Sequence, residues 1–395
     1  MSLNNPRFIL PVIVFSQFAG TSLWFAGNAV LPELILELSL DLSAVGHVTM
    51  AVQAGFIIGT LVFAALNVAD RYSPVKVFFV CSILGALFNL SVILASGYAS
   101  LLTARFLTGF FLAGIYPVGM KIASDWHKKG LGKALGYLVG ALVLGTAFPH
   151  FLKFAGGDLP WRFVMMSTSV LSASGGLLLL LTVSDGPYGG RKGDFKPSAM
   201  FKLFKDKNFR SAAFGYFGHM WELYTFWAFV PVMLAYYNSE TAGDLSIPIW
   251  SFMIIAVGSI SCIIGGYISL KKGSKYVAMV SLMISGICCL VSPFIFSLPL
   301  WIFLLILLVW GISVVSDSPQ FSTLVAQSAD RSYVATGLTL VNSLGFATTI
   351  ISIQILTVMW VEFITPWVFL ILLAGPLFGL ISIRKFKINS ATLKQ

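Results

Sequence analysis

Two stretches of equal length decide the fold. Residues 109–117 read GFFLAGIYP, and residues 311–319 read GISVVSDSP. Each begins with a glycine and ends with a proline inside a long apolar segment, and they lie about 200 positions apart in a chain of 395 residues. Glycine lets helices approach closely and proline weakens a helix. The repetition of both residues at one spacing indicates that the second half of the chain copies the first.

Other matches occur at nearly the same offset. Pro32 corresponds to Pro231, LNVADRYS at 66–73 to GYISLKKG at 266–273, and PWRF at 160–163 to PWVF at 366–369. Any single match has an alternative explanation, because glycine and proline are frequent in all membrane helices. Several matches in one register favour the duplication of a six-helix unit, and parallel repeats of this size are a transporter architecture.

The composition excludes most other classes of protein. Hydrophobic residues make up 57% of the chain and charged residues only 10%, against roughly 25% charged residues in a soluble domain. A disordered chain is excluded by the 34 Phe and 10 Trp residues, because disorder requires few aromatics. The four cysteines lie in apolar segments with neither metal-ligand spacing nor a disulfide pattern. We therefore expect a membrane protein with no metal and no cofactor.

Apolar windows predict an all-α polytopic protein of two pseudo-symmetric six-helix bundles, because a membrane-spanning helix needs about 20 apolar residues. The polar insertion after the sixth segment divides the chain into an N-terminal bundle (1–183), a linker (184–208) and a C-terminal bundle (209–395). The twelve predicted spans are 8–34, 44–67, 75–97, 99–123, 134–154, 160–183, 209–237, 247–269, 275–296, 298–324, 334–359 and 363–384.

The distribution of basic residues predicts the orientation. With both termini in the cytoplasm, nearly all of the 25 Lys and Arg residues fall in cytoplasmic segments, and the exceptions are Arg105, Lys153 and Arg162. Cytoplasmic loops carry an excess of Lys and Arg. This explains the net charge of +10 better than nucleic-acid binding does. We expect a functional monomer in the lipid bilayer of the cell (inner) membrane.

In these features the chain resembles the major facilitator superfamily over nearly its whole length. The loop after the second helix carries Asp70 and Arg71 where that family has Gly-x-Leu-Ala-Asp-Arg-x-Gly-Arg-Arg, although Leu66 replaces the first glycine. The second-half copy keeps Gly266, Lys271 and Gly273. The fourth helix runs from Arg105 through Gly109 to Pro117 and is similar to the family's Arg-x-x-x-Gly pattern.

The resemblance implies a division of labour among the helices. In that family the first, fourth, seventh and tenth helices line a central cavity, and the aspartate matched by Asp70 helps to hold the two halves together in the outward-open state. The fifth helix lacks the Gly-Pro pair of many exporters of the family, which weighs weakly against a drug-type antiporter.

Three charges are clear cases of a charge deep within a predicted span, where a charge costs about 2.5–3.5 kcal/mol on insertion scales. They are Arg105, Glu222 and Asp317, and all three fall on helices of the implied cavity set. His219 lies three residues before Glu222, so both share a helix face. We expect proton coupling to involve Glu222, His219, Arg105 and Asp317. Glu222 has two alternative roles, in substrate contact and in structural pairing.

Polar stripes on three helices predict the substrate contacts. One stripe is expected on each of the first, fourth and tenth helices, because the spacings place their members on one helix face. Hydrogen bonding between helices is the alternative explanation, and Asp317 could instead be an inner gate contact. The predicted substrate-binding residues are Gln17, Thr21, Trp24, Asn28, Arg105, Tyr116, Glu222, Trp310, Ser313, Asp317, Gln320 and Asn342.

These features favour a secondary transporter that moves a small polar or amphipathic organic solute by alternating access, coupled to protons, with symport preferred. A proton-driven antiporter or exporter of drugs or metabolites is the alternative. A non-transporting receptor and a membrane-embedded enzyme are more remote, because the four histidines are scattered over the chain. The sequence contains no GxxxxGK[ST] phosphate-binding loop, so nothing indicates an ATP-driven pump.

Overall fold

A computed structural model of the protein describes residues 6–127, 131–189, 199–241, 243–329 and 333–387. Every regular element in this part of the chain is helical, which confirms the all-α prediction. The elements are α1 (Pro6–Thr21), α2 (Ala26–Ala29), α3 (Leu31–Leu38), α4 (Ala44–Ala65), α5 (Val68–Arg71), α6 (Pro74–Ser91), η1 (Val92–Leu94), α7 (Tyr98–Leu112), α8 (Tyr116–Trp126), α9 (Leu131–Gly156), α10 (Arg162–Thr182), α11 (Ala199–Leu203), α12 (Lys207–Thr241), α13 (Ile247–Lys272), α14 (Ser274–Val291), η2 (Ile295–Ser297), α15 (Leu300–Ser316), α16 (Ser318–Ser328), α17 (Val334–Phe363), η4 (Pro366–Leu373) and α18 (Ala374–Arg384).

Ten helical segments of the described residues are long and apolar enough to cross a membrane. The other two crossing segments are the broken series α1–α3 and the 35-residue helix α12. α12 is the least apolar of the long helices, because it carries His219, Glu222 and a charged first turn. Together these segments make up the predicted twelve-helix architecture.

Several predicted spans are not single α-helices, and three of them break well inside the segment. The span 8–34 ends its first helix at Thr21 and resumes at Ala26, so the expectation of one continuous helix is wrong. The spans 99–123 and 298–324 are each interrupted just before a proline, between α7 and α8 and at Asp317 between α15 and α16. Proline has no N–H to offer the preceding turn and disfavours helix at the residue before it.

The break at Pro319 leaves a carbonyl that another helix uses. A regular helix would bond the N–H of residue 319 to the carbonyl of Val315, and proline cannot supply it. The thiol of Cys262 on α13 donates to that oxygen at 3.4 Å.

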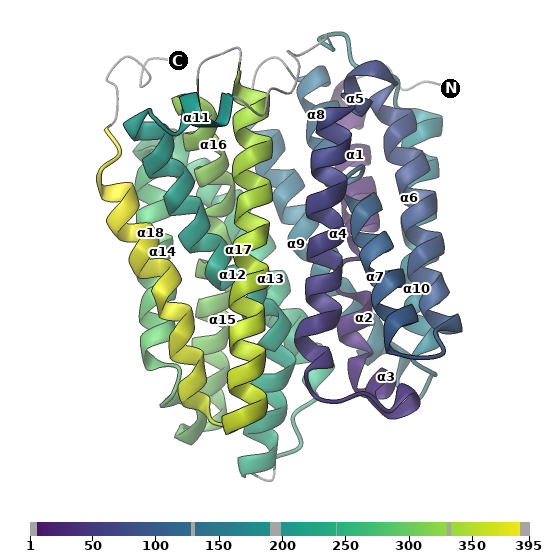
Figure 1. Ribbon diagram of the computed structural model, residues 1–395, viewed down its shortest axis with the longest axis vertical. Helices are drawn as coiled ribbons and strands as arrows, with labels where there is room; N and C mark the ends of the chain where they lie inside the picture. Colours follow the sequence, from purple (N-terminus) through teal and green to yellow (C-terminus); the bar gives the residue numbers. More distant parts are fainter. Residues whose placement is uncertain (1–5, 128–130, 190–198, 242, 330–332, 388–395) are drawn as a thin grey trace.

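The helices form two groups, α1–α10 and α12–α18, with the short α11 between them in sequence (Figure 1). We call them the N-terminal and C-terminal halves. α1 begins and α18 ends at the same face of the molecule (Figure 1), which we call the terminal face. The matching glycines allow an equivalent close contact between two helices in each half. A methyl group added at Gly109 would lie 2.1 Å from the Val52 carbonyl oxygen, and one at Gly311 would lie 2.0 Å from that of Ile254.

The repeat does not extend to the two loops that were aligned at 66–73 and 266–273. Asn67 adopts a left-handed conformation (φ 49°) and starts the short helix α5. Gly266 instead lies inside α13, which continues to Lys272 and ends at Gly273 with φ +83°. A methyl group at Gly266 would touch nothing within 4 Å. The two loops therefore share composition without sharing backbone shape.

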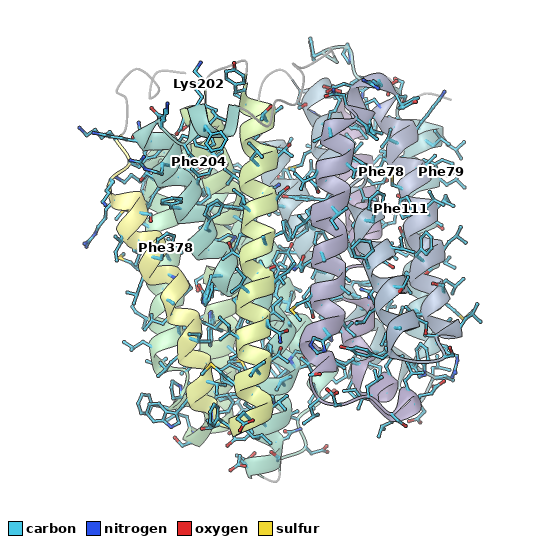
Figure 2. All side chains as sticks on the ribbon, viewed as in Figure 1. Phe78, Phe79, Phe111, Lys202, Phe204 and Phe378 are labelled. Atoms are coloured by element: carbon cyan, nitrogen blue, oxygen red, sulfur yellow. The ribbon has the colours of Figure 1, made fainter. Side chains whose placement is uncertain are left out.

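The outer surface is apolar around the helices. Leu181, Ile287, Val358 and Ile381 are more than half exposed, and side chains project outward all along both halves (Figure 2). Contiguous apolar surface of this extent is not found on soluble monomers. It fits contact with lipid.

Candidate substrate and proton site

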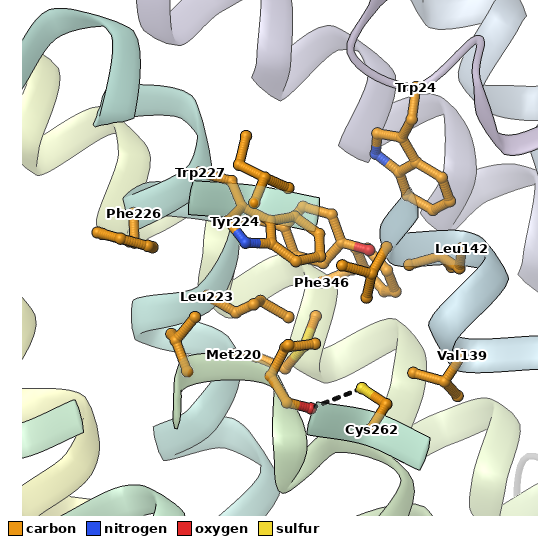
Figure 3. Close-up of a cluster of buried hydrophobic side chains, with 14 of the residues drawn as sticks. Trp24, Val139, Leu142, Met220, Leu223, Tyr224, Phe226, Trp227, Cys262 and Phe346 are labelled. Atoms are coloured by element: carbon orange, nitrogen blue, oxygen red, sulfur yellow. Dashed lines mark hydrogen bonds between the residues drawn. The ribbon is translucent and has the colours of Figure 1, made fainter. Parts of the chain in front are cut away.

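The centre of the boundary between the halves is filled by aromatic rings. We call Trp24, Phe25, Phe56, Tyr224, Trp227 and Phe346 the central aromatic cluster. Trp24 stacks on Tyr224 and Phe346 of the other half, with ring centroids 5.6 and 5.7 Å away. Phe56 lies 4.5 Å from Phe346. The cluster therefore joins α4 and the α1–α2 turn to α12 and α17 (Figure 3).

The break in the first span places Trp24 in this cluster. Residues 22–25 form a turn between α1 and α2, and Arg105 on α7 binds that turn from the other side. Its Nη2 donates to the carbonyls of Leu23 (3.0 Å) and Trp24 (2.6 Å). Its Nη1 donates to Oδ1 of Asn89 at 2.8 Å. Arg105 thus holds the turn whose far side carries the tryptophan ring.

The Arg105 network belongs wholly to the N-terminal half. Asn89 on α6 donates in turn to Thr168 (3.1 Å) and Ser169 (2.9 Å) on α10. No ion pair joins Arg105 to a carboxylate among the described residues. Arg105 therefore does not pair with Glu222, whose partners lie in the other half.

Glu222 lies inside the C-terminal half, surrounded by three donors. Its carboxylate accepts from Trp310 Nε1 at 2.5 Å, Ser285 Oγ at 2.9 Å and Cys289 Sγ at 3.3 Å. Ser285 and Cys289 are one turn apart on α14, and Trp310 is on α15. Both carboxylate oxygens are thus bonded to neutral groups. The predicted position in the seventh helix stands, but the side chain faces away from the boundary between the halves.

His219 and Asp317 meet one helical turn nearer the terminal face. His219 Nδ1 lies 2.8 Å from Asp317 Oδ1, and both side chains are almost fully buried. Asp317 occupies the break between α15 and α16. Nε2 of His219 has no hydrogen-bond partner. His219 and Glu222 do share one face of α12, as the sequence predicted, and that face is directed toward α14, α15 and α16.

The halves are in close contact at the end opposite the terminal face. A methyl group at Gly46, near the end of α4 opposite the terminal face, would lie 2.1 Å from Thr357 Oγ1 on α17. At the terminal face a cavity of about 150 Å³ lies between the same two helices, lined among others by Thr60, Asn67, Thr336 and Thr339. The central aromatic cluster lies between these two ends.

Comparison with known proteins decides the family. The sequence profile of the Major Facilitator Superfamily matches residues 13–353. The chain belongs to the Major Facilitator Superfamily. Because this is a family of transporters, the chain is not an enzyme.

Solved structures of the superfamily share the fold over nearly the whole chain. A bacterial homologue of the human lysosomal transporter Spinster, inward-facing and unoccupied, matches with a TM-score of 0.70 at 16% identity, covering 98% of each chain. A point mutant of the nucleoside transporter NupG matches with a TM-score of 0.73 at 17% identity, covering 97% of this chain and 100% of that one. At these identities the likeness shows the fold alone.

Three curated relatives are similar in sequence over part of their length. The nitrate/nitrite transporter NrtP of Picosynechococcus sp. is 26% identical over 48% of this chain and 40% of its own. The 3-(3-hydroxy-phenyl)propionate transporter of Escherichia coli is 30% identical over 41% of each. The 4-hydroxybenzoate transporter PcaK of Pseudomonas aeruginosa is 29% identical over 38% and 35%. The chain therefore spans about two fifths of the length of the relatives it matches.

Several predicted contacts of this superfamily member do not form one site. The stripe on the first helix is wrong as a single face, because the helix breaks after Thr21. Gln17 lies against Gly119 inside the N-terminal half, Thr21 donates to the Gln17 carbonyl at 2.8 Å, and Asn28 donates to Thr49 at 2.7 Å. Of the four, only Trp24 reaches the opposite half.

The remaining predicted residues are dispersed over four elements. Asn342 on α17 accepts from the Tyr216 hydroxyl at 2.6 Å. Ser313 donates back to the Val309 carbonyl at 2.9 Å, Gln320 is buried in α16, and Tyr116 begins α8. Because the helix breaks at Asp317, the expected stripe from Trp310 to Gln320 does not lie on one straight face.

The predicted loop residues lie at the terminal face. Asp70 pairs with Lys121 of its own half at 2.9 Å, and Lys121 also lies 3.5 Å from Asp125. Asp70 and Pro117 both line the cavity there. Arg71 and Lys271 are exposed.

Sequence reasoning missed the partners that organise the site. They are Asn89, Tyr224, Trp227, Ser285, Cys289 and Phe346. Asn89 is an isolated amide in an otherwise apolar span, and Ser285 and Cys289 are small polar residues one turn apart. These residues stand out in the sequence, but the sequence does not show which helices they face.

Proposed function

We propose that this protein is a proton-coupled secondary transporter that moves a small organic anion across the membrane by alternating access. The observation that carries the proposal is the buried His219–Asp317 contact at the α15–α16 break. An ionisable pair inside a membrane protein is costly and marks ion or proton pathways. The two helical halves would provide the moving parts.

The His219–Asp317 pair is suited to exchange a proton. Imidazole and carboxylate groups can each take up and release a proton, and here the two side chains lie in direct contact. Glu222 is less suited, because three neutral donors already occupy its oxygens. Protonation of Asp317 would release His219 and loosen the contact of α12 with the α15–α16 break. α16, which follows the break, packs against α9 of the N-terminal half, so this change can reach the other half.

The comparisons support an anionic solute. NrtP, the 3-(3-hydroxy-phenyl)propionate transporter and PcaK carry names of solutes that are anions at neutral pH. The cavity is open toward the terminal face, which the basic residues of the sequence assign to the cytoplasm. We further propose that the protein works as a monomer in the cell (inner) membrane, with residues 1–183 and 209–395 moving against each other around the linker.

Asp317→Asn tests the assignment of the proton. We expect purified protein in liposomes to accumulate labelled 4-hydroxybenzoate when the outside is made acidic. The variant should lose this accumulation and retain exchange of labelled for unlabelled solute, because exchange needs no net proton movement. Asp244→Asn, an exposed aspartate in the loop after α12, is the matched control and should accumulate normally.

Glu222→Gln is measured beside it. Full accumulation by Asp317→Asn, together with loss of accumulation in Glu222→Gln, would mean that Glu222 and not Asp317 binds the coupled proton. Accumulation driven by a gradient of the opposite sign would make the protein an antiporter. Movement of every anion without any dependence on the pH gradient would refute proton coupling.

A further inference from the structure

Two indole N–H groups in the central aromatic cluster have no acceptor. Trp24 and Trp227 are both fully buried, and Nε1 of each lacks a hydrogen-bond partner. Four other tryptophans donate normally: Trp126 to the Ser184 carbonyl, Trp161 to Glu37, Trp221 to the Ile371 carbonyl and Trp310 to Glu222. Unpaired buried donors are rare in native proteins and call for an explanation.

The two free donors come from opposite halves and flank one ring. Trp24 stacks on Tyr224 at 5.6 Å, and Trp227 meets the same ring edge-on at 5.2 Å. In Figure 3 the Trp24 nitrogen and the Tyr224 hydroxyl are both directed toward the middle of the cluster. A molecule held there would contact both halves at once, which is the position required of a transported solute.

The charge that binds the Trp24 turn is positive, and no described carboxylate pairs with it. The Arg105 guanidinium donates only to neutral acceptors, one of which is the carbonyl of Trp24 itself. Nε of Arg105 is buried without a hydrogen-bond partner. A buried charge with no opposite charge beside it is strongly disfavoured. An anion placed against the Trp24 ring would lie on the other side of that turn and would offset this cost.

We propose that, when the halves separate, Trp24 and Trp227 bind the carboxylate of a planar aromatic solute through their indole N–H groups, with its ring taking a place among Phe56, Tyr224 and Phe346, which pack on one another in this structure. This assignment rests on the proposed transport function and names its substrate class. An indole N–H donates and cannot accept, so the pair selects acceptors and not ammonium groups. Aromatic side chains favour stacked or edge-on contact with a flat ring.

Equilibrium binding to the purified full-length protein tests the assignment. The probes are 4-hydroxybenzoate and 4-hydroxybenzyl alcohol, which share a ring and differ in the carboxylate, and Kd is measured by calorimetry at one pH without a membrane gradient. We expect the acid to bind at least about 10-fold more tightly than the alcohol. Trp24→Phe and Trp227→Phe each keep a ring and remove one donor, and should weaken the acid by about 10-fold or more while changing the alcohol little.

Two control variants separate donation from packing. Trp367→Phe makes the same substitution at a tryptophan that is 56% exposed and should leave both Kd values unchanged. Phe346→Leu removes a stacking ring and should weaken acid and alcohol equally. The thermal unfolding of every variant is recorded, so that a misfolded variant is recognised.

Three results would overturn the proposal. They are no binding of 4-hydroxybenzoate to the unmodified protein, wild-type affinity in both tryptophan variants, and equal weakening of acid and alcohol by those variants. Because no gradient is present, the loss of proton coupling would not alter these Kd values. Failure of this assignment would likewise leave proton-coupled movement of another anion intact.

Discussion

At the scale of single residues, Asn89 connects three helices through one amide. It accepts from Arg105 and donates to Thr168 and Ser169. A buried amide in this position both fixes the arginine and links α6 to α10. The turn that carries Trp24 is therefore supported from behind by two neighbouring polar side chains, and an aromatic contact between the halves depends on an amide inside one of them.

Asn89→Ala should destabilise the protein strongly. It leaves Arg105 Nη1 without its acceptor, and an unsatisfied buried group costs about 1–3 kcal/mol, more when it is charged. We expect a lower Tm in detergent, measured by scanning fluorimetry. Asn208→Ala, an amide at the terminal face that bonds the exposed Lys387 carbonyl, should change Tm far less. Equal losses in the two variants would contradict the role given to Asn89.

At the scale of elements, close helix contacts and helix breaks occur together in one sequence pattern, a glycine followed eight positions later by a proline. Gly109 brings α7 onto the backbone of α4, and Gly311 brings α15 onto α13. In both copies the helix then breaks before the proline. The first break in the chain, after Thr21, has no such proline, and Arg105 stabilises it from another helix.

Gly109→Ala and Gly266→Ala form a matched pair. A methyl group at Gly109 would meet the Val52 carbonyl oxygen at 2.1 Å, whereas one at Gly266 would meet nothing within 4 Å. We expect Gly109→Ala to lose about 1–3 kcal/mol, as overpacking usually does. Gly266→Ala should be neutral or slightly stabilising, because alanine favours helix over glycine by about 1 kcal/mol. A comparison of the two unfolding temperatures decides, and an unperturbed Gly109→Ala would show that α7 can move away freely.

The sequence predicted the membrane class, the twelve segments and the three buried charges, because each follows from composition along the chain. Glu222 shows the limit. Its helix and its buried position were predicted, but Ser285 and Cys289 could be identified as its partners only once α12, α14 and α15 were packed together. The helix-1 stripe failed for the same reason, since the break after Thr21 is held by Arg105, 82 positions away from Leu23.

At the scale of the whole molecule, α4 and α17 face each other across the boundary between the halves. They are in close contact at the end opposite the terminal face. Gly46 and Thr357 mark the contact, while Thr60 and Thr336 line the cavity at the other end. The central aromatic cluster lies between.

A disulfide across the closed end should arrest transport. Gly46→Cys with Thr357→Cys places two thiols at a contact where Cβ atoms are already close, and the four native cysteines are buried. We expect oxidation to abolish solute exchange in liposomes and a reductant to restore it. Gly46→Cys alone is the control and should not respond to oxidant. Full exchange with the bridge formed would mean that the contact need not open.

The unpaired indoles of the central aromatic cluster also have an optical consequence. Tryptophans that are fully buried and lack a hydrogen bond emit at short wavelength, and contact with water shifts the emission to longer wavelength. Trp24 and Trp227 come from opposite halves, so separation of the halves would wet both of them, and a bound aromatic ring would quench them. In a background where the other tryptophans are replaced by phenylalanine, the protein carries its own fluorescent reporter of which end is open.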